Sequence, residues 1–158
     1  MIKKFIFFVL IFLPFNSYAL IEVDITRGNL NPLPMAVSPL SIDENSRKNF
    51  EKILDKKDIG SEISLIVENN LRTSGLFNPL NKEAFLQKPD IANLKPRFED
   101  WSLIKAQALI TGKVNYVDEK LRVEFRLWDV LAGKEMMALA FTTVPNNWRR
   151  VGHIITDK

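Results

Sequence analysis

The residue types that usually carry out chemistry are scarce in this chain. It has no cysteine and one histidine, His153, which excludes thiol nucleophiles and leaves zinc or Ser-His sites without their usual partners. There is no glycine-rich phosphate loop, and no pair of carboxylates lies in an apolar setting that would raise one pKa. Asp24, Asp100 and Asp129 fit a strand edge, a helix cap and a turn. The sequence therefore predicts a non-enzymatic protein with no cofactor and no metal, in which His153 is a satisfied or exposed helix residue.

The first nineteen residues have the three parts of a Sec-type signal peptide. Lys3 and Lys4 precede an apolar run at 5–13, and small residues lead to Ala19. The run is shorter than the roughly 20 residues of a membrane-spanning helix, so cleavage after Ala19 is favoured over an uncleaved anchor. Removing this leader lowers the formal net charge from +3 to +1. A nearly neutral chain lacks the excess of basic residues that is typical of proteins that bind nucleic acid. We expect an exported domain that is held together by packing, without disulfides.

The segment that cleavage would expose alternates apolar and polar residues. In an extended chain, Ile21, Val23 and Ile25 point to one side, and Glu22 and Asp24 point to the other. Turn residues at 27–29 and two prolines separate this segment from the next element. A free strand of this kind adds to the sheet of a partner or pairs within its own domain, and the pattern alone favours neither.

The remaining sequence predicts strands and helices in mixed order. Strands are expected at 35–40, 108–117, 121–130 and 136–144, with an extended segment at 76–80 and a hairpin turn at Ala132 and Gly133. The strict alternation within 121–130 predicts one buried face and one wetted face. The aromatic residues are expected to pack helices onto the sheet.

Two longer helices and several short elements are predicted. One helix begins after a cap at Asp58 and ends at Gly75, and another runs from 148 to 157 after a cap at Asn146 or Asn147. A short helix through 101–106 would be capped by Glu99 or Asp100, and a single turn at 82–86 by Asn81. Residues 41–57 are expected to be a loop with one helical turn, and 87–96 a connection. The last helix stops with the chain, which suggests a truncated sequence.

These motifs, in this order, resemble the amino-terminal domain of the TolB family of the Gram-negative Tol-Pal envelope system. The resemblance rests on IEVDITRG at 21–28, PMAVSP at 34–39, NLRTSGLFNPL at 70–80, the segment from Trp101 to TGKV at 111–114, VEFRLWDV at 123–130 and WRRVGHII at 148–155. It implies an α/β fold of the α+β-like kind, a mixed sheet with two or three helices packed against it. It divides the chain into a signal peptide (1–19), an extended partner-binding segment (20–31) and one domain (32–158).

The resemblance also implies an interaction protein of the periplasm that supports outer-membrane integrity and cell division. It favours binding of TolA, an inner-membrane protein, through the mature N-terminus, and it implies binding of the lipoprotein Pal only with a propeller that this sequence does not supply. The alternative is an exported α/β domain that binds a small ligand. The residues expected to contact TolA are Leu20, Ile21, Glu22, Val23, Asp24, Ile25 and Thr26.

Overall fold

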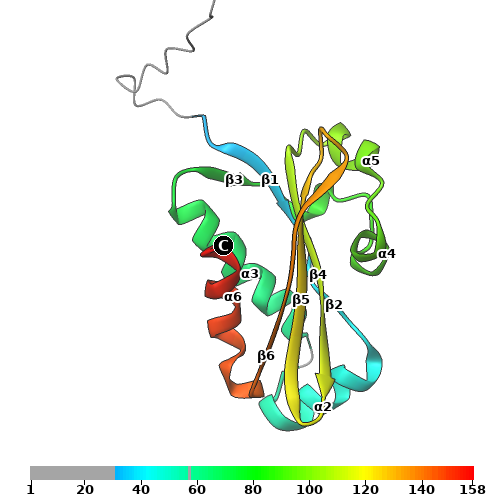
Figure 1. The fold of residues 1–158 in the computed structure, drawn as a ribbon, viewed down its shortest axis with the longest axis vertical. Helices are drawn as coiled ribbons and strands as arrows, with labels where there is room; N and C mark the ends of the chain where they lie inside the picture. The colour runs from blue at the N-terminus through cyan, green and yellow to red at the C-terminus, as the bar shows by residue number, and fades with distance from the viewer. Residues whose placement is uncertain (1–30, 57) are drawn as a thin grey trace, which may run out of the picture. The chain divides into compact units, whose positions relative to one another are not determined.

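The computed structural model describes residues 31–56 and 58–158, which form one mixed β-sheet with helices on both faces (Figure 1). The strands are β1 (Leu33–Val37), β2 (Ser41–Ile42), β3 (Phe77–Pro79), β4 (Ala108–Val117), β5 (Lys120–Asp129) and β6 (Lys134–Thr143). The helices are α2 (Glu44–Leu54), α3 (Ile59–Thr73), α4 (Pro89–Leu94), α5 (Phe98–Leu103) and α6 (Trp148–Thr156), with single 3-10 turns η1 (Lys82–Ala84) and η2 (Pro145–Asn147). The predicted α/β class is confirmed, but the described residues contain five α-helices instead of two or three.

The sheet combines parallel and antiparallel pairing. Its strand order is β3-β1-β4-β5-β6, and β2 pairs with β4 beyond the end of β1. The pairs β1–β3, β1–β4 and β2–β4 are parallel, whereas β4–β5 and β5–β6 are antiparallel hairpin pairs. β3 and β6 therefore form the two edges of the sheet, and β1 lies inside it.

The alternation predicted for β5 is confirmed by its burial. Leu121, Val123 and Phe125 are buried, whereas Arg122 is exposed and Glu124 is half-buried. The larger core lies on the side covered by α3 and α6 (Figure 1) and contains Phe50, Ile63, Val114, Val123, Trp148 and Ile155, among others. A smaller core on the opposite face contains Ala36, Trp101, Ala106, Leu109, Trp128 and Val130.

Helix α3 follows its sequence signals closely. The Asp58 carboxylate accepts a hydrogen bond from the Ser61 amide at 3.1 Å, which caps a free donor of the first turn. Ile63, Val67 and Leu71 are buried at helical spacing. Gly75 has a φ of +72°, a left-handed conformation that glycine adopts without strain.

The region predicted as a loop at 41–57 contains a well-formed helix, so this prediction was wrong. Asp43 caps α2 by accepting a hydrogen bond from the Ser46 amide at 2.8 Å. The Glu44 carboxylate lies 3.8 Å from Nζ of Lys48, one turn later. Phe50 is the apolar residue of α2 that is fully buried in the core. Because this helix is anchored by a cap and one aromatic residue, its apolar stripe is too sparse for periodicity to reveal it.

Two further expectations about the short helices need correction. The predicted connection at 87–96 contains α4, which begins at Pro89, a residue suited to the first helical turn. In α5 the residue at the cap position is Arg97, which makes no side-chain capping bond. Glu99 and Asp100 lie inside the first turn instead, where their charge suits the helix dipole. In α6, Asn147 occupies the predicted cap position but likewise makes no side-chain capping bond.

Candidate functional site

The predicted partner-binding segment, 20–26, lies outside the described residues, as does the predicted cleavage site. The structure describes the chain from Asn31 onward, and β1 begins two residues later at Leu33. The amide of Leu33 donates to the carbonyl of Leu76 at 2.9 Å, at the point where β1 joins β3. The first strand after the candidate segment, β1, is therefore an internal strand of the sheet and begins seven residues after Thr26.

His153 is an exposed helix residue, as predicted. Its Nδ1 lies 2.9 Å from Nδ2 of Asn70, and the same amide nitrogen donates to the Thr156 hydroxyl at 2.9 Å. These contacts join α6 to α3 near their ends. His153 therefore has a structural hydrogen-bond role, and no Asp, Glu or second His in the described part of the chain joins it in a cluster suited to a metal ion.

Asp100 belongs to a polar network that holds α5 in place. The buried Gln87 donates to the Asp100 carboxylate at 3.0 Å, and the Trp101 indole donates to the Gln87 carbonyl oxygen at 3.2 Å. The Gln87 hydrogen bond is the main reason that the pKa of Asp100 is lowered, and Arg97 lowers it further, against an opposing effect of burial. Because a lowered pKa keeps Asp100 ionised at neutral pH, this carboxyl is unsuited to act as a general acid.

The other polar and aromatic residues considered as functional candidates also have structural roles. Asp129 accepts a hydrogen bond from the Ala132 amide at 2.8 Å and so stabilises the β5–β6 turn, as predicted. Trp101, Trp128 and Trp148 are all buried, which confirms that they pack in the core and do not form an exposed stacking surface. Arg149 is exposed, with its guanidinium 4.2 Å from the ring centroid of Trp148. Within residues 31–56 and 58–158, no buried side-chain nitrogen or oxygen lacks a hydrogen-bond partner.

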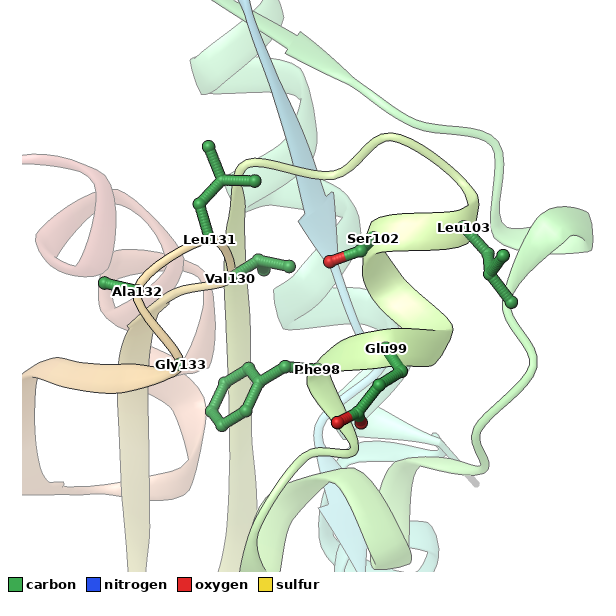
Figure 2. Close-up of a pocket in the computed structure, with 8 residues that line it drawn as sticks. All are labelled: Phe98, Glu99, Ser102, Leu103, Val130, Leu131, Ala132 and Gly133. Carbon is green, nitrogen blue, oxygen red and sulfur yellow. The ribbon is translucent and has the colours of Figure 1, made fainter.

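A hollow of about 620 Å³ lies between α5 and the β5–β6 turn (Figure 2). Phe98 points toward the turn at Gly133, whereas Leu103 points away from the turn. Leu103 and Leu131 are 75% and 73% exposed. Such exposed walls do not form the enclosed apolar pocket with convergent polar groups that a small ligand requires.

The exposure of Leu103 follows from its position relative to Trp101 in α5. Trp101 is buried at 1% exposure, and a residue two positions later on an α-helix is rotated by about 200°, toward the opposite side. The helical spacing of Trp101 and Leu103 was therefore the signal that could have identified this exposed leucine.

None of the helices in the described part of the chain is long and apolar enough to span a bilayer. The fold is that of an α/β domain, and among its described residues Asp100, Asp129 and His153 take part in hydrogen bonds within the domain. The sequence profile of the TolB amino-terminal domain matches residues 21–136. The chain therefore belongs to the TolB amino-terminal domain family, the family that its motifs resemble.

The chain is also similar to individual proteins. The chain is 77% identical over all 158 residues to the Tol-Pal system protein TolB of Pelagibacter ubique (strain HTCC1062), of which it spans 35% of the length. The crystal structure of TolB from Acinetobacter baumannii matches 80% of this chain and 27% of its own with a TM-score of 0.60 at 18% identity, which shows a shared fold. PelC from Paraburkholderia phytofirmans matches 79% of this chain and 86% of its own at 15% identity and a TM-score of 0.49.

Proposed function

We propose that this chain acts as a periplasmic, non-enzymatic component of the Tol-Pal system, supporting outer-membrane integrity and cell division. Family membership and the name of the Pelagibacter relative support the system. The basic, apolar and small-residue parts of the first nineteen residues support export. The chain spans about a third of the length of that relative, so membership of the family does not by itself establish these roles.

Within this role, residues 20–26 bind TolA by adding a strand to its sheet. The observation that carries this step is that the family profile begins at Ile21, inside the alternating segment, so the segment is part of the family domain. In strand addition, main-chain hydrogen bonds supply affinity and alternate side chains supply selectivity. Ile21, Val23 and Ile25 would enter apolar pockets of TolA, while Glu22 and Asp24 would raise the association rate.

Calorimetric titration with the C-terminal domain of TolA from the same genome tests this proposal. A chain that begins at Leu20 should bind, and one that begins at Asn31 should not. Failure of the longer, folded chain to bind, or equal binding by both chains, would refute the assignment of TolA binding to this segment.

A point substitution localises the interaction further. Ile25→Asp should weaken TolA binding at least about tenfold, because it places a charge at an apolar anchor of the interface. Ile91→Asp makes the same change at an isoleucine of α4 that is 52% exposed, and it should leave the affinity unchanged. Both variants should melt like the parent chain, and an unchanged affinity for Ile25→Asp would remove this residue from the interface.

A further inference from the structure

The two edges of the sheet differ in how well they are protected against pairing with another chain. β3 is three residues long and ends in Pro79, which cannot donate a backbone hydrogen bond. β6 is ten residues long, and its charged residues, Lys134 and Glu135, both lie at its start. Short edges, prolines, charges and bulges are the usual protection of an edge strand. The pairing of β6 with β5 is irregular at Met136, so the part of β6 that lacks these protections begins at Met137.

The apolar side chains of β6 are also accessible. Met136 is 60% exposed and Leu139 is 38% exposed, and among the described residues β6 pairs with β5 alone. The strand therefore presents a row of backbone groups and apolar side chains that a further strand could cover.

A hollow lies on each face of the sheet at this edge. On the helix side, a groove of about 150 Å³ lies between β6 and α6, and its apolar lining includes Phe141, Val151 and Ile154. On the opposite face, a groove of about 200 Å³ is lined by residues that include Arg122, Arg126, Ala138 and Ala140. Because side chains of a strand point alternately to the two faces, a strand added to β6 would direct its side chains into these two grooves in turn.

The two grooves differ in the residues that line them. Opposite the helices, Lys113, Arg122 and Arg126 contact only two carboxylates, those of Glu124 and Glu135, at 3.0 to 3.4 Å. Burial alone would raise the pKa of Glu124, but Arg122 and Lys113 lower it overall. This face therefore has a surplus of positive charge beside the small side chains of Ala138 and Ala140, whereas the helix-side groove combines the apolar Phe141, Val151 and Ile154 with one basic residue, Arg150.

We propose that β6 accepts an extended strand from a partner protein, with apolar side chains directed toward α6 and acidic side chains toward Arg122 and Arg126. The occupant is an amphipathic strand with alternating apolar and acidic residues. This surface accepts a strand, so it is distinct from the TolA proposal, in which residues 20–26 donate one.

A peptide titration tests the proposal directly. The chain, produced from its full 158-residue sequence, is mixed with a fluorescent heptapeptide of alternating valine and glutamate, and anisotropy gives the affinity. Two control peptides replace glutamate by lysine, or carry N-methyl groups that block hydrogen bonding along one peptide edge. The glutamate peptide should bind, both controls should fail, and NMR amide shifts should concentrate on β6. Equal binding of the lysine peptide, or shifts concentrated away from β6, would overturn the proposal.

A matched pair of variants tests the charged face. Arg122→Gln should weaken peptide binding about fivefold, the scale of one cross-strand charge pair. Arg72→Gln is the control. It removes an exposed arginine of α3 that, like Arg122, is paired with a glutamate, in this case Glu68 at 2.7 Å. It should leave the affinity for the peptide unchanged. Sedimentation of the chain as a dimer with β6 protected by the second copy would also overturn the proposal, because the occupant would then be another copy of this chain.

Discussion

Helix α3 approaches the backbone that connects β1 and β2 very closely at Gly60. A Cβ atom built on Gly60 would lie 2.1 Å from the carbonyl oxygen of Leu40 and 3.1 Å from its carbonyl carbon. Ser64, one turn later, fixes the same backbone: its hydroxyl accepts from the Leu40 amide at 3.0 Å and donates to the Ser38 carbonyl at 3.1 Å. We therefore predict that Gly60→Ala forces α3 away from this segment.

The size of the effect follows from two opposing contributions. Alanine is a better helix former than glycine by about 1 kcal/mol. Against this, overpacking of a tight interior contact costs about 1–3 kcal/mol, and disrupting the buried bond between Leu40 and Ser64 adds about 1–3 kcal/mol. The atoms in the way are backbone atoms, which cannot rotate aside. We expect a net loss of about 1–5 kcal/mol in the free energy of unfolding.

Urea denaturation of the parent and variant chains measures this loss. Asn69→Ala serves as the control, because Asn69 is exposed on the same helix and its replacement should change stability by less than about 0.5 kcal/mol. A Gly60→Ala variant with the midpoint and m-value of the parent would refute the reasoning. The free energy of unfolding would then be unchanged, so the contact with Leu40 would cost no more than the helix propensity of alanine provides.

Three further results are expected. Asp43→Ala should cost about 1 kcal/mol of stability, since it removes the cap of α2, and a urea midpoint equal to that of the parent would contradict this. Hydrogen bonds from the Ser46 hydroxyl and amide lower the pKa of Asp43 below its unfolded value; its stabilising contribution is therefore complete above the unfolded pKa, near 4, and is lost as the pH falls through the folded pKa. Acid titration of Asp43→Asn followed by circular dichroism should consequently show a shallower loss of stability than the parent. At the α3–α6 contact, a Cβ on Gly152 would lie 2.8 Å from Cγ2 of Ile66. Overpacking there costs about 1–3 kcal/mol and alanine regains about 1 kcal/mol of helix propensity, so Gly152→Ala should destabilise by up to about 2 kcal/mol, and by less in an Ile66→Ala background if this contact is the cause.

The elements that could be predicted from sequence are those with both a terminus signal and a clear period. In α3, a capping aspartate and a glycine end enclose apolar residues at helical spacing. In β5, the alternation of Leu121, Val123 and Phe125 with polar residues gave both the strand and its buried face. Each of these segments specifies its own conformation locally, because the pattern alone determines which side chains can be buried together.

The missed elements depend on partners far away in the sequence. α2 has one fully buried aromatic residue, Phe50, which contacts Tyr116 of β4 edge-on with ring centroids 5.4 Å apart. In α4, the carbonyl oxygens of Asn93 lie 3.4 Å from the guanidinium of Arg126 in β5. The parallel pairing of β1 and β2 with β4 is of the same kind. Such contacts become apparent only once the sheet has formed, so neither period nor composition predicts them.

The scarcity of reactive side chains and the open edge of the sheet both support the proposal of a protein that acts by binding other proteins. The polar groups that could have formed an active site, such as Asp100 and His153, are engaged in holding α5 and α6. The exposed edge of β6 fits the pairing of a further strand. The two proposals differ in the role of this chain, which donates an acidic strand to TolA in the first and accepts an acidic strand beside Arg122 and Arg126 in the second. Ile25→Asp should therefore weaken the first interaction and spare the peptide bound at β6.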